Sequence, residues 1–265
     1  MILDIIVEAT RERIERNKQD ISAQRMKEIA LNMPITEGFS FEEALRKKGI
    51  HFICEVKKAS PSKGIIAEDF PYLAIAKEYE KAGASCISVL TEPEFFLGMD
   101  SYLSEIKREV SIPVLRKDFV VEPYQIYQAK ILGADAILLI CSILNDKELK
   151  EYLALSKELG LSALVEAHDE IEVERALQAG AGIIGVNNRN LKTFEVDIRT
   201  SGRLRKLVPE DILFVAESGI KTAEDIRILK EDKVNGVLIG ETLMKSPDKK
   251  KMLAELRGDG IGDEG

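Results

Sequence analysis

An acidic and a basic side chain two residues apart mark the stretch from Ile50 to Gly64, which reads I-H-F-I-C-E-V-K-K-A-S-P-S-K-G. Its first part is an apolar run typical of a buried strand, and the run ends with Glu55 and Lys57. Alternation along a strand sends residues i and i+2 to the same face. The carboxylate and the ammonium group therefore share one space, where burial is costly unless they pair or do chemistry. The pair by itself is equally compatible with a structural ion pair.

The same kind of ending returns in three further apolar runs. They end as Leu115-Arg116-Lys117-Asp118, Leu164-Val165-Glu166 and Ala216-Glu217-Ser218-Gly219. Lysines close to one another lose proton affinity, and nearby carboxylates restore some of it, so a lysine tuned in this way at these strand ends can act as a general acid near neutral pH. We expect Glu166, beside an apolar strand, to have a raised pKa and to donate or accept a proton.

A divalent metal ion is the competing interpretation of these acidic residues. Glu55, Glu166 and Glu217 are suitable ligand types, but the lysines among them would repel a cation. The chain has only two histidines, which makes a histidine-based metal site or a Ser-His-Asp triad unexpected. We therefore expect no bound metal.

The elements that position these residues alternate regularly along the chain. Apolar runs are separated by amphipathic segments of helical period, which predicts eight βα units. The predicted strands are 51–57, 86–90, 112–116, 135–140, 162–166, 182–187, 212–217 and 235–239. The predicted helices are 70–82, 98–109, 122–132, 145–159, 169–179, 200–206 and 222–230, followed by a short turn at 241–244 and a helix from 248 to 256.

Eight buried parallel strands favour a closed (β/α)8 TIM barrel, with an open doubly wound sheet as the alternative. No G-x-G-x-x-G motif follows the first run, which weakens the dinucleotide-binding version of the open sheet. In a barrel, alternate strands fill the same interior layers and active sites lie at the carboxyl ends. The ends of strands one, three, five and seven would then converge on one pocket. Glycines at 83, 133 and 180, and more loosely 236, fit left-handed helix C-caps before alternate strands.

We expect a single domain with an extension at each end. Residues 1–49 form an N-terminal helical extension, with one helix over 2–31 and a short one over 41–48. The barrel covers 50–256, and 257–265 is a C-terminal tail. The N-terminal segment is too thin to fold alone, so we expect it to be a lid or a plug on the barrel.

Loops after strands seven and eight have residues suited to an anion. Barrels often bind phosphate there, and Gly219 and Gly240 would let the backbone approach it closely while Ser218 adds a hydroxyl. The alternative is that these glycines only make tight turns. Phe95, Phe96 and Phe119 are either core residues or an aromatic wall for a planar ring. His51 begins a strand and is expected to be structural, and His168 is expected first as a helix-entry residue and second as a neighbour of the site.

Composition limits the partners and the setting. The 265 residues carry a net charge of -8 with a pI near 5.2, which argues against nucleic acid or anionic membrane as a partner. Cys54, Cys86 and Cys141 lie in apolar runs and indicate buried thiols of a reducing compartment. The N-terminus lacks a signal-peptide pattern, so we expect a cytoplasmic protein. The sequence leaves the oligomeric state open, and a monomer is compatible with it.

Five motifs carry a specific resemblance over nearly the whole chain. They are Glu55-Val-Lys-Lys-Ala-Ser-Pro-Ser-Lys-Gly64, Leu115-Arg-Lys-Asp-Phe119, Leu164-Val-Glu-Ala-His168, Asn187-Asn-Arg-Asn-Leu191 and Glu217-Ser-Gly219. The chain resembles the indole-3-glycerol-phosphate synthase family of tryptophan biosynthesis, whose fold is a (β/α)8 barrel with an extra N-terminal helical segment. The resemblance implies a carboxy-lyase that closes the ring of a carboxyphenylamino-deoxyribulose 5-phosphate with loss of CO2 and water. This chemistry needs no cofactor.

The resemblance also implies residue roles. Lys117 is similar to the general acid of ring closure, Glu166 to the residue that handles protons in dehydration, and Lys57 with Glu55 to the pair that holds the carboxylate. Asn187 and Ser218 resemble residues that orient the substrate. The expected binding residues for the anthranilate ring and the sugar phosphate are Ser60, Phe96, Phe119, Leu138, Arg189, Glu217, Gly219, Gly240 and Glu241. The carboxylate of Glu241 would have to point away from a phosphate and leave only its backbone N–H to bind it.

Two other functions stay open on the sequence. A phosphoribosylanthranilate isomerase-like barrel would share the phosphate end, although two lysines and two glutamates fit ring closure better than an isomerisation. A catalytically silent barrel that binds a sugar phosphate or a partner subunit would be expected to lack at least one of Lys57, Lys117 and Glu166, and all three are present.

Overall fold

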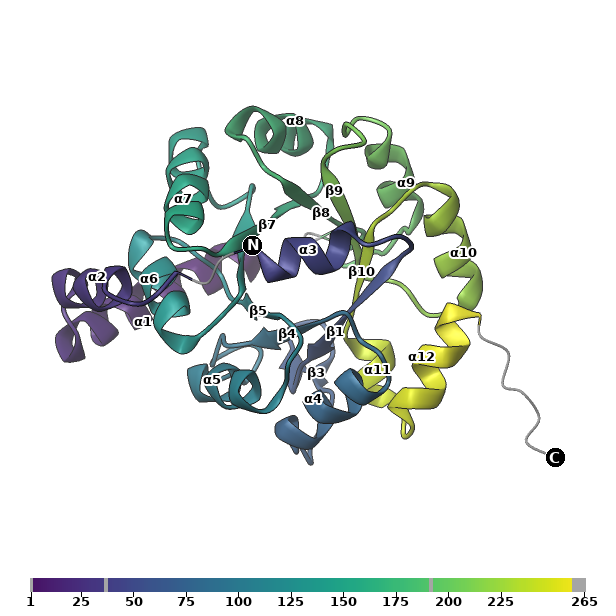
Figure 1. The fold of residues 1–265 in the computed structure, drawn as a ribbon, viewed down its shortest axis with the longest axis horizontal. Helices are drawn as coiled ribbons and strands as arrows, with labels where there is room; N and C mark the ends of the chain where they lie inside the picture. The colour runs from purple at the N-terminus through teal and green to yellow at the C-terminus, as the bar shows by residue number, and fades with distance from the viewer. Residues whose placement is uncertain (1, 36–37, 191–192, 259–265) are drawn as a thin grey trace.

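Eight parallel strands form a closed barrel in the computed structural model, which describes residues 2–35, 38–190 and 193–258 (Figure 1). Each strand pairs with the next along the chain, and the last pairs with the first. The strands are β1 (His51–Val56), β4 (Cys86–Leu90), β5 (Val114–Lys117), β6 (Ala136–Ile140), β7 (Ser162–Ala167), β8 (Ile183–Asn187), β9 (Leu213–Glu217) and β10 (Gly236–Ile239). The predicted closed barrel is confirmed, and the open doubly wound alternative is wrong.

Helices surround the barrel and cover its outer face (Figure 1). They are α4 (Tyr72–Lys81), α5 (Asp100–Glu109), α6 (Pro123–Leu132), α7 (Asp146–Glu158), α8 (Glu170–Ala179), α9 (Arg199–Arg205), α10 (Ala223–Glu231), α11 (Glu241–Lys245) and α12 (Lys249–Arg257). Capping boxes begin α7 at Asn145 and α10 at Thr222, where the N-cap and N3 side chains each satisfy a backbone N–H of the other residue. Gly133 and Gly180 end their helices at φ 85° and 88°, as predicted for left-handed C-caps. Gly236 is instead the first residue of β10, and Lys233 has the positive φ in that connection.

Side chains alternate between two apolar layers along each strand. Outward residues such as Cys54 and Val165 belong to the core between barrel and helices, whereas inward residues such as Ile53, Leu115 and Leu164 fill the barrel. An inward apolar residue is followed two positions later by a polar one on β1, β5, β7 and β9, and these polar residues are Glu55, Lys117, Glu166 and Glu217. The strand period thus carries the charged side chains to one end of the barrel interior.

The N-terminal segment forms three helices rather than the predicted two. They are α1 (Ile2–Asp20), α2 (Ala23–Leu31) and α3 (Ser40–Arg46). The predicted single helix over 2–31 is wrong because the chain breaks at Ser22, whose hydroxyl accepts the N–H of Arg25 and begins α2. Helix α2 packs against α6. Residues 36 and 37 lie outside the described part of the chain.

Helix α3 closes the amino-terminal end of the barrel, and α1 lies at the other end. Phe41 and Leu45 of α3 are fully buried among the inward residues of the strands, and Figure 1 shows α3 crossing the centre of the ring. At the carboxyl ends, Ile2, Leu3 and Ile6 of α1 line the central cavity. The N-terminal segment therefore contains both a plug and a lid. His51 lies at the plugged end, where its ring contacts Ser85 Oγ and Lys47 O.

Helix α12 is hydrogen-bonded back to the residues that follow α4. Arg257 donates to the carbonyl oxygens of Ala82 and Gly83, at 2.8 Å and 2.5 Å. Gly258 ends the helix, and the rest of the predicted tail, 259–265, lies outside the described residues. All three cysteines are buried and unpaired, as predicted. No helix in the described ranges has the length and apolar character required to cross a membrane.

Candidate active site

A cavity of about 720 Å³ opens at the carboxyl ends of the strands. Every residue that the sequence predicts for the site lines it. They are Glu55, Lys57, Ser60, Phe96, Lys117, Phe119, Leu138, Glu166, Asn187, Arg189, Glu217, Ser218, Gly219, Gly240 and Glu241. The geometric expectation that these side chains share one space is confirmed, whereas their roles stay predictions.

Glu55, in β1, and Lys57, directly after this strand, form a close ion pair. Lys57 Nζ lies 2.5 Å from Glu55 Oε1. Burial alone would raise the pKa of Glu55, but Lys57 and Lys117 outweigh it and hold that pKa below its ordinary value. A Cβ at position 240 would lie 2.4 Å from Glu55 Oε1 and 2.8 Å from Lys57 Nζ, so any larger residue there would have to displace this pair.

Lys117 lies between two carboxylates at the centre of the cavity. Its Nζ is 3.7 Å from Glu166 Oε2 and 3.6 Å from Glu217 Oε2. Burial would lower the pKa of Lys117, but Glu217, Glu166 and Glu55 together raise it above its ordinary value. The expected tuning toward neutral pH is therefore wrong in direction, because carboxylates rather than other lysines surround the ammonium group.

Glu166 contacts two cations, Lys117 and His168. The shift of its pKa is also opposite in direction to the expected one. Burial would raise that pKa, but Lys117 and His168 outweigh it and lower it to about 2. His168 Nε2 lies 3.3 Å from Glu166 Oε1. His168 directly precedes the N-cap of α8, as expected first, and it also contacts a site carboxylate, as expected second.

Glu217 is the carboxylate whose proton affinity rises. Burial is the main cause, Lys117 opposes it, and Glu166 and Glu55 reinforce it, so the pKa of Glu217 reaches about 8. Glu217 Oε1 is buried and has no hydrogen-bond partner among the described residues. A Cβ at Gly185 would lie 2.4 Å from this oxygen, so the neighbouring strand leaves room for it. The site therefore holds one carboxyl group suited to carry a proton beside two that stay ionised.

The rim of the cavity after β9 and β10 has tight backbone turns and positively charged side chains. Ser218 and Gly219 have positive φ values of 67° and 83°. Arg189 lines this rim, and its backbone N–H donates to Asn187 Oδ1 at 3.1 Å. Glu241 pairs with Lys245 at 2.7 Å and lies 3.7 Å from Lys63. Its negative charge is thus neutralised by two lysines that sequence reasoning did not single out.

Aromatic and apolar side chains form the opposite wall. The rings of Phe96 and Phe119 have centroids 6.0 Å apart, whereas Phe95 is not among the lining residues. Glu92 holds the Phe96 loop because its Oε2 accepts the backbone N–H groups of Phe95 and Phe96 at 2.7 Å and 3.0 Å. Leu138 and Ile140 of β6 continue this surface.

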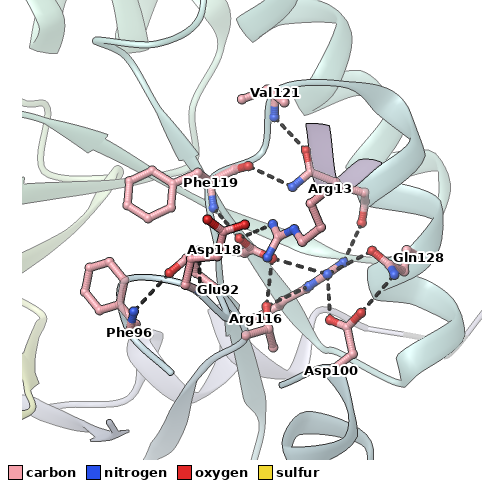
Figure 2. Close-up of polar contacts among 12 residues, drawn as sticks. Arg13, Glu92, Phe96, Asp100, Arg116, Asp118, Phe119, Val121 and Gln128 are labelled. Atoms are coloured by element: carbon pink, nitrogen blue, oxygen red, sulfur yellow. Dashed lines mark hydrogen bonds and ion pairs between the residues drawn. The ribbon is translucent and has the colours of Figure 1, made fainter. Parts of the chain in front are cut away.

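A buried ion network behind the aromatic wall joins the lid to β5, as Figure 2 shows. Asp118 Oδ1 accepts from Arg13 Nη2 at 2.8 Å and from the backbone N–H of Phe119 at 2.8 Å. Asp118 Oδ2 accepts from Thr91 at 2.9 Å and lies 3.3 Å from Arg116 Nη2. Burial would raise the pKa of Asp118, but Arg13 and Arg116 keep it below its ordinary value. The residue next to Lys117 is thereby fixed from three elements.

The loop after β1 is more ordered than predicted. The Ser-Pro-Ser-Lys-Gly stretch is flanked by β2 (Ala59–Ser60) and β3 (Gly64–Ile65), two strands that the sequence analysis did not predict and that pair as a short antiparallel hairpin. The hairpin turn brings Ser60, Pro61, Ser62 and Lys63 to the cavity.

Several lining residues were not predicted because they come from distant parts of the chain. Ile2, Leu3 and Ile6 belong to the predicted N-terminal helix, and only the docking of α1 brings them to the cavity. Arg13 carried no sequence signal beyond its charge. In the described ranges, no group of three His, Cys, Asp or Glu residues has the arrangement to hold a metal ion.

Comparison with known proteins identifies the family. A family model described as indole-3-glycerol phosphate synthase matches residues 3–256. A protein of that name from Ruminiclostridium cellulolyticum is 58% identical over 97% of this chain and 99% of its own length. Another from Endomicrobium trichonymphae is 59% identical over 97% of this chain and 100% of its own length. The crystal structure of 3-hexulose-6-phosphate synthase from Salmonella typhimurium superposes with a TM-score of 0.65 at 13% identity, over 79% of this chain and 97% of that one, and it shares the fold. On this geometry and these matches, the chain belongs to the indole-3-glycerol phosphate synthase family.

Proposed function

We propose that the cavity converts 1-(2-carboxyphenylamino)-1-deoxyribulose 5-phosphate to indole-3-glycerol phosphate, CO2 and water. The reaction closes a ring onto a ketone carbon, expels the carboxylate as CO2 and then eliminates water. The substrate supplies its own electron sink, so the protein has to provide acids, bases, an anion site and a dry slot for the ring. The juxtaposition of Lys117 with Glu166 and Glu217, at 3.7 Å and 3.6 Å, is the observation that carries the proposal.

Lys117 is proposed as the acid of ring closure. A strongly held ammonium group protonates a ketone poorly, but it is acidic enough for the alkoxide that develops as the new carbon–carbon bond forms. The surrounding carboxylates keep the group charged until then. Charge that is already in position where an oxyanion develops costs no reorganisation during the reaction.

Glu166 is proposed as the base of dehydration. Its lowered pKa keeps it ionised in the free protein, ready to take a proton as the hydroxyl leaves. The ammonium group of a site lysine would protonate the departing hydroxyl. Glu55 and Lys57 are proposed to hold the substrate carboxylate until CO2 leaves, and Asn187 to orient the sugar.

Opposite parts of the cavity would bind the two ends of the substrate. The phosphate is proposed to lie at Ser218, Gly219 and Gly240, where backbone N–H groups and the cation of Arg189 are within the lining. The anthranilate ring is proposed to lie against Phe96, Phe119 and Leu138, and Ser60 of the first loop borders this slot. Glu241 would contribute its backbone, since its side chain pairs with lysines.

The direct test is an assay of pure protein with the carboxyphenylamino-deoxyribulose phosphate. We expect indole absorbance to appear together with one equivalent of CO2. The same protein should not isomerise phosphoribosylanthranilate at a comparable rate. No indole product, or isomerisation as the faster reaction, would contradict the proposed function.

We further propose that the protein works in the cytoplasm as a single-domain monomer whose partner is this small molecule. Three buried thiols fit a reducing compartment, and the acidic composition disfavours nucleic acid. The continuous packing of the N-terminal helices on the barrel supports one domain. Light scattering of the purified chain would measure the molecular mass in solution, and about twice the chain mass would contradict the monomer.

A further inference from the structure

A carboxylate–imidazole–carboxylate chain lies directly behind the cavity, at the end of β7. His168 Nδ1 contacts Glu172 Oε2 at 2.9 Å, and His168 Nε2 points to Glu166 Oε1 at 3.3 Å. The imidazole is mostly buried, with 17% of its side chain exposed. It is thus enclosed between a site carboxylate and an acidic residue of α8.

The outer end of this chain is rigidly built. Glu172 Oε2 also accepts the backbone N–H of His168 at 2.8 Å, so one oxygen binds both the main chain and the ring of the same residue. The backbone N–H of Glu172 donates to Asp169, the N-cap of α8, at 2.9 Å. The start of α8 therefore holds the carboxylate that contacts Nδ1, and rotation of the imidazole would break this 2.9 Å contact.

At the inner end of this chain, the two carboxylate oxygens of Glu166 face different partners. Oε1 faces His168, whereas Oε2 faces Lys117 Nζ at 3.7 Å. The contact between Nε2 and Oε1 has the distance of an ion pair, but its angle makes no hydrogen bond, and the buried Nε2 has no other partner among the described residues. Loose contacts of this kind in a free enzyme often tighten when substrate binds.

We propose that His168 is a positioning residue that anchors Oε1 of Glu166 and so presents Oε2 to Lys117 and the substrate. The proposal rests on the catalytic role proposed above for Glu166. Neither the comparisons nor the motif assignments give His168 this task. A carboxylate pinned at one oxygen loses the freedom to rotate, so the other oxygen is held ready for proton transfer.

Charges around His168 favour its protonated form, in which both ring nitrogens carry a proton and can donate it when the contact tightens. Burial would lower its pKa, but Glu166 and Glu172 raise it to about 10. Lys117 and Glu217 face the same carboxylate from β5 and β9. A second cavity also borders the imidazole, and its other charged lining residues are Asp4, Glu8, Asp169, Glu172, Arg175, Arg189, Glu195, Asp197 and Arg203.

The first experiment compares variants by steady-state kinetics between pH 5 and pH 9. In His168→Ala we expect kcat to fall by about ten- to a hundredfold, as for other residues that orient a reacting group, with little change in KM. Loss of the cation also raises the pKa of Glu166 from about 2, so the acid limb of kcat, which lies below this range in the wild type, should move up toward pH 5 and lower kcat at the acid end of the range. His168→Gln can still donate a hydrogen bond, so it should recover part of kcat while the acid limb stays displaced.

The chain offers a matched control in its only other histidine. His51 lies at the plugged end of the barrel, and His51→Ala should keep the wild-type kcat and pH profile. Wild-type kinetics in both His168 variants would overturn the proposal. If the wild type itself made no indole product, the proposed function would fail instead, which is a separate outcome.

A second measurement does not depend on turnover. With two histidines, the ring signals can be assigned in an NMR titration by comparing wild type with His51→Ala. We expect His168 to stay protonated through pH 8, and Glu172→Gln to lower its titration point. A neutral His168 at pH 8 in the wild type would refute the anchored arrangement even in an inactive protein.

Discussion

Ring closure is proposed to depend on the ammonium group of Lys117. In Lys117→Ala we expect kcat to fall by about 10²- to 10⁴-fold, the usual range for loss of a general acid. Binding of indole-3-glycerol phosphate should persist, because the phosphate end lies in other loops. Calorimetric titration with that product checks binding, and single-turnover assays check the chemical step.

Lys147→Ala serves as the control for this experiment, since Lys147 is 82% exposed and remote from the cavity lining. It should match the wild type in both measurements. Full turnover in Lys117→Ala would contradict the role assigned to the lysine.

The raised pKa of Glu217 predicts a distinct dependence of stability on pH. Its pKa rises on folding from 4.5 to about 8, so the folded protein binds this proton more tightly than the unfolded chain. Its contribution is therefore fully present below about pH 4.5 and is lost as the pH rises through 8. Glu217→Gln keeps a neutral group of similar shape at every pH. The stability of the wild type relative to this variant should fall by up to about 1.4 kcal/mol per pH unit between pH 5 and 8.

Urea unfolding of both proteins at several pH values measures this difference. Glu241→Gln is a suitable comparison, because the pKa of Glu241 is lowered rather than raised and its pH dependence has the opposite sign. Parallel stability curves for the wild type and Glu217→Gln would show that Glu217 is ionised in the folded protein.

At the scale of elements, the strand ends were predictable because a strand has a strict period of two. Glu55, Lys117, Glu166 and Glu217 each follow an inward apolar residue by two positions, so their convergence follows from the sequence. The hairpin at 59–65 and the break at Ser22 were missed, because each depends on a few local hydrogen bonds that composition does not reveal. Signs of pKa shifts were wrong for Lys117 and Glu166, since they depend on which neighbour is nearest rather than on which residues are present.

One of the contacts that dock α1 beside β5 is the buried ion pair between Arg13 and Asp118. In Arg13→Ala, Asp118 keeps Arg116 but loses a charged hydrogen bond at 2.8 Å, so we expect about 1–3 kcal/mol of lost stability. The loosened lid then has to be ordered by the substrate. If about 1 kcal/mol of this ordering moves to the binding step, KM rises by about fivefold while kcat changes less.

Arg16 on the same helix provides the control for this ion pair. Its guanidinium is 60% exposed and reaches Glu12 and Glu94 only at 3.8 Å and 3.6 Å, so Arg16→Ala should change stability and KM little. A double-mutant cycle with Asp118→Asn would isolate the coupling between Arg13 and Asp118. Equal kinetics for Arg13→Ala and Arg16→Ala would show that the pair does not order the lid.

At the scale of the whole molecule, the N-terminal segment belongs to both ends of the barrel. From the sequence it could be a lid or a plug, and we expected removal of residues 1–45 to weaken substrate retention more than folding. The burial of Phe41 and Leu45 argues that folding would suffer as well, because both side chains are fully enclosed by inward residues of the strands. The two functions are divided along the segment, with α1 over the cavity and α3 in the opposite end.

Two truncations should therefore behave differently. A chain that starts at Met33 lacks α1 and α2 but keeps α3, and we expect a folded barrel with a raised KM, because Ile2, Leu3 and Ile6 no longer cover the cavity. A chain that starts at Arg46 also loses Phe41 and Leu45. Emptying a fully buried site of this size costs about 2–5 kcal/mol for each side chain, which together approaches the whole stability of a typical domain. Circular dichroism and urea unfolding of both chains measure the outcome, and a stable, cooperative barrel in the shorter chain would show that α3 is dispensable for folding.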